Sequence, residues 1–214
     1  LLIVLVAPLT TSEFTYTPPT GYSEWGSSTV SVSGGSIQSA SAAQPIDFQP
    51  DFVWIKNRDA LKNNMLYDVV RGATKTINSN TDGAEATHSD ALTSFDSNGF
   101  TVGSKAHVNA SGQDIVAWCW KGGGSSVSNT DGSRTSTISA NPDAGFSIVK
   151  YTGAASAGTI GHGLGKVPKL IFIKRLNHSG TDWIAYSSEL DSTAPQDYWI
   201  TPQTSISRQN AGSQ

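Results

Sequence analysis

Cysteine, charge and long apolar runs are all scarce in this sequence of 214 residues. Cys119 is the only cysteine, so no disulfide can form within the chain and its stability must come from packing or from oligomerisation. Charged residues make up 14% of the chain, the formal net charge is −3, and Lys and Arg form no cluster. The electrostatic footprint of a nucleic-acid-binding protein is therefore missing, and we expect no nucleic-acid partner.

The longest apolar run opens the chain, at residues 1–7 (LLIVLVA). It is too short to span a bilayer, and it lacks the basic stretch that precedes the apolar part of a signal peptide. We interpret it as a β-strand and expect no membrane partner. The chain begins without methionine and has a single one, Met65, which predicts a processed product or a segment of a longer polypeptide.

Short apolar runs rich in Val, Ile, Thr, Phe, Tyr and Trp recur along the rest of the chain, separated by Gly, Ser, Asn and Asp. This pattern predicts β-strands and no comparable helix. The clearest runs cover residues 51–56, 65–70, 99–102, 114–120, 145–151, 169–174 and 183–186. The pairs Asp82-Gly83, Asn98-Gly99 and Asp131-Gly132 predict tight turns between antiparallel strands. None of them has the ligand spacing of a calcium-binding EF-hand loop.

An internal repeat becomes visible when residues 48–56 are laid over residues 166–174, which places Pro50 on Pro168, 118 residues further on. The same offset places Trp54 on Phe172 and Met65 on Trp183. We predict an all-β fold of tandem antiparallel β-sandwich units of jelly-roll or lectin-like type. The second unit stops before any counterpart of the strands at Phe100 and Trp118, so it must borrow strands or be marginally stable, because an unpaired β-edge invites pairing with another chain.

The predicted organisation has four parts. Residues 1–28 are an N-terminal strand segment, residues 29–121 the first unit, residues 122–145 a linker or β-ribbon, and residues 146–214 the second, incomplete unit.

Residues that could carry catalysis are few. Asp51, Asp68 and Asp114 flank or enter strands and could in principle supply the two carboxylates of a glycosidase, but their places favour turn and strand-edge roles. The four histidines have no metal-ligand spacing, and residues 161–168 (GHGLGKVP) lack the Ser or Thr that follows Lys in a phosphate-binding loop. We expect no enzymatic activity, no cofactor and no metal.

The aromatic residues and the lone thiol offer the remaining candidate sites. Cys119 lies between Trp118 and Trp120, and strand alternation should send it to the opposite face from both indoles, as a buried structural thiol rather than a nucleophile. Trp54, Trp118, Trp120 and Trp183 occur in apolar strands and are predicted to be core residues. Asp197, Tyr198 and Trp199 lie in a predicted loop between prolines, and they are our candidate ligand-binding residues.

Several stretches together resemble repeated β-domains of tail and fibre proteins of marine bacteriophages. They cover residues 49–59 (QPDFVWIKNRD), 70–75 (VRGATK), 92–103 (LTSFDSNGFTVG), 115–121 (IVAWCWK), 127–132 (VSNTDG) and 161–165 (GHGLG). Residues 14–22 (FTYTPPTGY) resemble the end of a lectin-like SPRY segment, reduced here to a short stub.

The resemblance implies a virion structural protein on the particle surface, part of a tail fibre, appendage or decoration, that assembles through its β-sandwich units. The expected partners are other copies, with a homotrimer favoured by analogy with phage fibres, and other virion proteins. The alternative is a carbohydrate-binding adhesin for host surface glycans.

Overall fold

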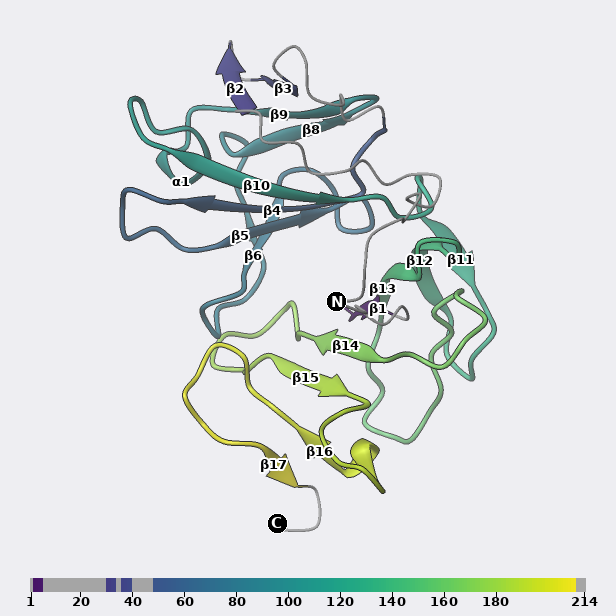
Figure 1. The fold of residues 1–214 in the computed structure, drawn as a ribbon. Coiled ribbons are helices and arrows are strands. Elements are labelled where there is room, and N and C mark those ends of the chain that lie inside the picture. The colour runs from purple at the N-terminus through teal and green to yellow at the C-terminus, as the bar shows by residue number, and fades with distance from the viewer. Residues whose placement is uncertain (1, 6–29, 34–35, 40–47, 211–214) are drawn as a thin grey trace, which may run out of the picture.

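The computed structural model describes residues 2–5, 30–33, 36–39 and 48–210. These residues form antiparallel sheets with one four-residue helix, α1 (Ala106–Asn109), so the predicted all-β fold is confirmed. Three sheets lie at successive levels in Figure 1, and we call them the upper, central and lower sheets. The central sheet packs against both of the others.

The central sheet contains three of the predicted strands, those at residues 51–56, 65–70 and 114–120. Its order is β10 (Ile115–Trp120), β4 (Phe52–Asn57), β5 (Met65–Asp68), β6 (Lys75–Asn78) and β7 (Ala86–Thr87). Successive side chains of a strand point to opposite faces. In β4, Val53 and Ile55 therefore face the upper sheet, whereas Phe52 and Trp54 face the lower sheet.

The upper sheet has the order β2 (Val30–Ser33), β3 (Ser36–Ser39), β9 (Gly99–Val102) and β8 (Leu92–Asp96). Asp96 pairs with Gly99, so the predicted turn at Asn98 is a tight two-residue connection between β8 and β9. Asp82-Gly83 lies instead in the longer loop between β6 and β7, and Asp131-Gly132 in the loop between β11 and β12.

A buried cluster joins the upper and central sheets, and we call it the upper core. Its members are Val53, Ile55, Met65, Tyr67, Ala91, Leu92, Phe100, Val102 and Val108. Val108 comes from α1, which covers one side of the cluster.

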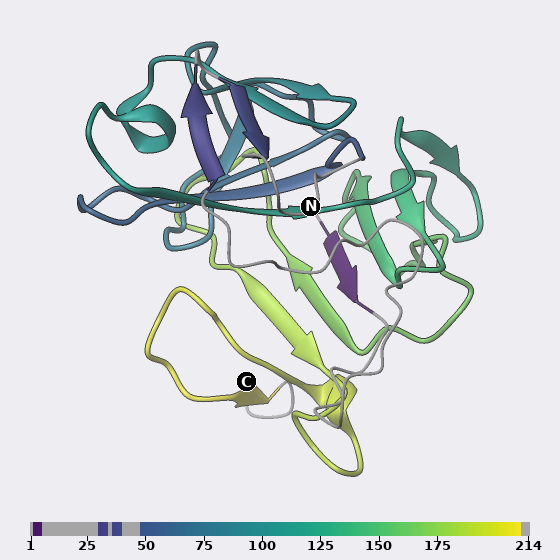
Figure 2. The ribbon, with the colours of Figure 1, turned by 45° about the horizontal axis from the view of Figure 1, so that its top comes forward.

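The lower sheet contains six strands. Its order is β11 (Val127–Asn129), β12 (Ser136–Asn141), β13 (Phe146–Tyr151), β1 (Leu2–Leu5), β14 (Leu170–Ile173) and β15 (Ile184–Ser187). The apolar run at the start of the chain thus forms a strand, and Figure 2 shows it in purple between β13 and β14. The stretch 122–145, for which a linker and a β-ribbon were both considered, supplies β11 and β12.

Glycines permit a sharp path where the chain approaches β14. Gly163 and Gly165 have φ of 75° and 64°, in the left-handed region that other residues rarely adopt. A Cβ at position 163 would also lie 2.6 Å from Cδ1 of Ile138. The glycine-rich stretch therefore serves as a turn, as the sequence predicts.

The final described segment contains the 3₁₀ helix η1 (Pro195–Asp197) and a small two-stranded sheet, β16 (Tyr198–Trp199) and β17 (Gln209–Asn210). The predicted SPRY-like stretch at residues 14–22 lies outside the described residues. Within the part of the chain that is described, no helix is long and apolar enough to cross a membrane.

Candidate functional site: an aromatic cleft

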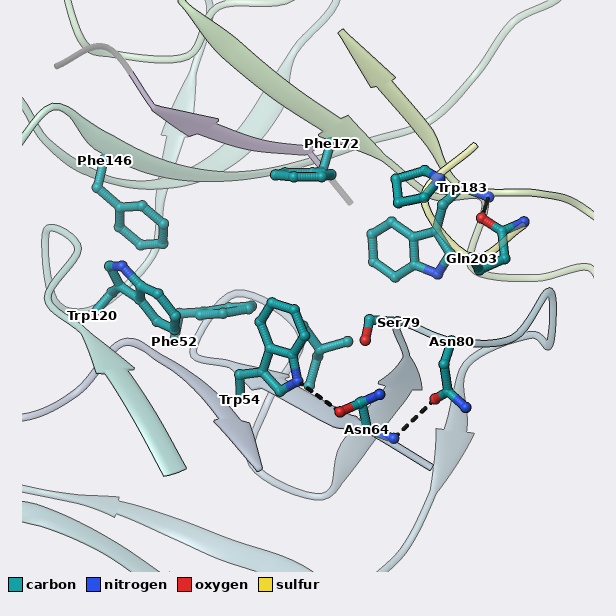
Figure 3. Close-up of a pocket in the computed structure, with 12 residues that line it drawn as sticks. Phe52, Trp54, Asn64, Ser79, Asn80, Trp120, Phe146, Phe172, Trp183 and Gln203 are labelled. Atoms are coloured by element: carbon teal, nitrogen blue, oxygen red, sulfur yellow. Dashed lines mark hydrogen bonds between the residues drawn. The ribbon is translucent and has the colours of Figure 1, made fainter. Parts of the chain in front are cut away.

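A cavity of about 460 Å³ opens between the central and lower sheets (Figure 3). Its apolar wall consists of Phe52, Trp54, Leu66, Trp120, Phe146, Phe172, Trp183 and Pro202. Four neutral polar residues complete the lining, namely Asn64, Ser79, Asn80 and Gln203. We call these twelve residues the aromatic cleft. Its volume falls within the range of small-molecule binding sites, about 300–1,000 Å³.

Ring contacts hold the aromatic wall in place. Phe52 and Trp120 meet edge to face with their centroids 5.2 Å apart, and Trp120 stacks on Phe146 at 6.4 Å with an interplanar angle of 21°. Trp54 meets Trp118 edge to face at 5.7 Å. Such offset and T-shaped pairs are the favoured arrangements of aromatic rings, so the wall exists before any ligand arrives.

Two of the three tryptophans that line the cavity, Trp54 and Trp183, have indole nitrogens with partners within the protein. Trp54 Nε1 donates to Oδ1 of Asn64 at 3.3 Å, and Trp183 Nε1 donates to the carbonyl oxygen of Asn78 at 2.9 Å. Figure 3 shows the two rings facing the cavity from opposite sides. Trp183 is almost fully buried, whereas Trp54 is partly exposed. The indole faces, rather than their N–H groups, are what the cavity offers to a ligand.

Amide side chains at the rim are held by hydrogen bonds. The backbone N–H of Asn64 donates to Oδ1 of Asn80 at 2.9 Å. Gln203 Oε1 accepts from the backbone N–H of Trp183 at 3.2 Å, and Gln203 Nε2 donates to Oδ1 of Asp182 at 2.6 Å. Among the described residues, Nδ2 of Asn64 has no hydrogen-bond partner, so this donor remains for a ligand.

None of the twelve lining residues is ionisable. The cleft therefore lacks the charged partners that anions or cations need, and it lacks an acid or base for proton transfer. Flat apolar rings with a few fixed amide and hydroxyl groups suit a neutral ligand that has both apolar faces and hydroxyl groups.

The three carboxylates considered for catalysis lie outside the cleft and have structural partners. Buried Asp68 accepts hydrogen bonds from the backbone N–H of Arg71 at 2.8 Å and from its Nε at 2.5 Å. Buried Asp51 accepts from the backbone N–H of Gly124 at 2.9 Å. Asp114 lies at an exposed strand edge, where its backbone N–H donates to Asp59. They occupy the turn and strand-edge positions that the sequence suggests.

Cys119 points away from the cleft, as strand alternation predicts. It packs against the upper core, while Trp120 packs against the cluster below. Burial raises the pKa of the Cys119 thiol to about 12, so the thiol is almost entirely protonated at neutral pH. In the described ranges, no group of three or more His, Cys, Asp or Glu side chains lies together in a way that could hold a metal ion.

The residues predicted to bind a ligand lie elsewhere, because Asp197, Tyr198 and Trp199 are not part of the cleft lining. The guanidinium carbon of Arg208 lies over the ring of Tyr198, 4.0 Å from the ring centroid. Trp199 pairs with Gln209 of β17.

Of the four tryptophans predicted to be core residues, Trp183 is buried, whereas Trp54, Trp118 and Trp120 are only partly buried. Trp54 and Trp120 line the cleft. Sequence reasoning missed the rim amides altogether. The available signal was the recurrence of Asn at strand ends, at 63–64 directly before β5 and again at 78–80, where β6 ends.

A family model described as a domain of unknown function (DUF7483) matches residues 22–212. The match covers most of the chain, which therefore belongs to this family. No curated protein and no solved structure matches the chain.

Proposed function

For this member of a family without an assigned activity, we propose that the aromatic cleft binds a neutral carbohydrate. The proposal is carried by one observation: a preformed cavity of about 460 Å³ is walled by aromatic rings and rimmed by neutral amides, and none of the described residues that line it is charged. The resemblance to phage tail and fibre domains supplies the setting, in which the ligand is a glycan of the host surface.

Carbohydrates have both features that suit the cleft, namely apolar faces and hydroxyl groups. A pyranose ring presents an apolar C–H face that can lie on an indole, and its hydroxyl groups both donate and accept hydrogen bonds. The partly exposed ring of Trp54 offers such a face, and the free Nδ2 of Asn64 offers a donor beside it. Because the cleft holds no charge, binding should change little with salt concentration.

A titration of tryptophan fluorescence tests this proposal. Neutral oligosaccharides such as cellohexaose and maltohexaose serve as probes, with polygalacturonate as the anionic comparison. We expect binding of a neutral probe, and we expect Trp54→Ala to weaken it at least about tenfold, the effect of losing one aromatic anchor worth roughly 1.4 kcal/mol. Trp199→Ala is the matched control, because it removes a partly buried indole outside the cleft.

The opposite pattern would reject the cleft as the binding site. If Trp199→Ala weakens binding and Trp54→Ala does not, the site lies in the C-terminal segment. Preference for polygalacturonate would contradict a site without charge.

A second proposed role is assembly, as a structural β-module of a virion appendage that contacts other copies and other virion proteins. The position of β1 favours it, because a strand from the far end of the chain completes the lower sheet. A protein with this role, like a glycan-binding module, requires no catalytic turnover.

A further inference from the structure

The strand β1 is embedded in the lower sheet with a partner on each side. Leu2 pairs with Val149 of β13 and with Ile173 of β14, and Leu5 pairs with Phe146 and Leu170. Both pairings are antiparallel. The other strands of this sheet all come from residues 127–187, so β1 is the one strand supplied by a distant part of the chain.

The register of β1 repeats that of β10 in the central sheet. Trp120 of β10 pairs with Phe52, and Leu5 of β1 pairs with Leu170, the residue 118 positions after Phe52. The remaining pairs follow the same offset, so residues 2–5 pair with β14 in the same register in which residues 117–120 pair with β4. Each repeat unit therefore has a place for a strand at this edge, and the lower sheet fills its place with β1.

We infer that the place between β13 and β14 is a strand-acceptor site, and that in an assembly it is occupied by β1 of a second copy of this chain. The inference rests on the proposed assembly role and is independent of glycan binding. Residues 6–29 alone join β1 to β2, and 24 residues can reach up to about 80 Å when extended. The sequence thus provides enough length for β1 to enter a neighbouring molecule.

Exchange between copies preserves the pairing. Both hydrogen-bonded edges of β1 would form with the same residues whether β13 and β14 belong to the same copy or to a neighbour, which is the condition for low-cost domain swapping. A reciprocal exchange gives a closed dimer, and a one-directional exchange gives an open chain of copies or a ring.

Cysteine crosslinking between two full-length chains tests the exchange. Val4 and Ser147 are register partners in β1 and β13. Directly opposed residues of antiparallel strands have Cα atoms about 4.5–5.5 Å apart, a separation that a disulfide can bridge. One chain carries Val4→Cys and the other Ser147→Cys, both in a Cys119→Ala background, with tags of different mass. The chains are unfolded together, refolded and oxidised.

We expect a disulfide-linked heterodimer from this mixture. The control replaces Ser147→Cys with Thr137→Cys on β12, which pairs with Lys150 and not with β1, and it should give little heterodimer. A double variant with Val4→Cys and Ser147→Cys in one chain shows whether residues 4 and 147 are neighbours. If the double variant closes its disulfide within single chains and the mixture gives no heterodimer, the exchange is overturned.

Sedimentation of the unmodified chain shows whether a failure of the strand exchange is also a failure of the proposed assembly role. If the unmodified chain is an oligomer but no crosslinked heterodimer forms, the assembly role stands and another surface carries it. A monomer at all concentrations, together with no heterodimer, rejects both the assembly role and the exchange.

Discussion

The two faces of the central sheet are built from alternate residues of the same strands, and both carry buried apolar residues, but only the face towards the lower sheet borders the aromatic cleft. Towards the upper sheet, Val53, Ile55 and Tyr67 are fully buried in a continuous core. Towards the lower sheet, Trp54 and Trp120 keep contact with solvent at the wall of a cavity. A period of two along each strand is enough to separate a face that supports stability from the face that we propose for recognition.

This separation means that neighbouring residues can be changed with different consequences. A residue of the upper face supports folding, and the next residue along the strand supports the cleft. Paired substitutions within single strands therefore test the difference between the two faces.

The largest expected effect is on stability, from Ile55→Ala. Ile55 has no exposed surface, and truncating a fully buried Ile to Ala costs about 2–5 kcal/mol of the free energy of unfolding. Trp54→Ala should cost less, roughly 1–2 kcal/mol, because the indole is already partly exposed in the folded chain. Urea unfolding of both variants measures the difference. A larger loss from Trp54→Ala would show that the aromatic face is the main core.

A smaller effect is expected at alkaline pH. Burial raises the pKa of Tyr67 and that of Cys119 to about 12, from ordinary values of 10.0 and 9.0. Between pH 9 and 12 the unfolded chain releases these protons before the folded chain does, so stability is retained below pH 9 and falls as the pH rises. From pH 8 to pH 10 the loss from these groups should be roughly 1–2 kcal/mol.

Urea unfolding at the two pH values measures this loss. Tyr67→Phe combined with Cys119→Ala is the control, because it removes both titrating groups from the upper face. An equally steep loss of stability in this variant would assign the alkaline effect to other residues.

The smallest expected effect on stability comes from Asn64→Ala. The substitution removes the acceptor for Trp54 Nε1, and water can replace it at this partly exposed site, so we expect a loss of only about 0.5–1 kcal/mol. Binding of a neutral oligosaccharide should nevertheless weaken several-fold, because Asn64 orients the indole and offers a donor. Asn129→Ala on β11, outside the cleft, is the control. Unchanged affinity in Asn64→Ala would remove this rim position from the site.

Local alternation made much of the central sheet predictable. The pattern of residues 51–56 indicates β4, and the opposite directions of Cys119 and its neighbouring indoles follow from the period of a strand. The all-β class follows in the same way from many short strands. These features depend on the two faces of one strand, which a sequence displays directly.

The cleft could not be predicted in this way, because it depends on contacts between distant segments. Asn64 and Gln203 line the same cavity although 139 positions separate them in the sequence. Trp54 has the sequence pattern of a core residue, yet its ring is partly exposed at the wall of the cavity.

The alignment of the two repeat units was also only partly predictable from the sequence. The ungapped offset of 118 places Met65 on Trp183, whereas the strand pairing puts Ile184 in the place of Met65. The connection between the two paired strands is therefore one residue longer in the second unit.

The most direct test compares two adjacent residues of β4 that face opposite ways, in titrations with neutral oligosaccharide followed by fluorescence. Ile55→Val removes one methylene from the upper core and should reduce stability by about 0.5–1.5 kcal/mol while leaving affinity unchanged. Trp54→Ala should weaken binding at least about tenfold in a chain that remains folded. Equal affinities for the two variants, or a greater loss in Ile55→Val, would contradict the assignment of recognition to the aromatic face.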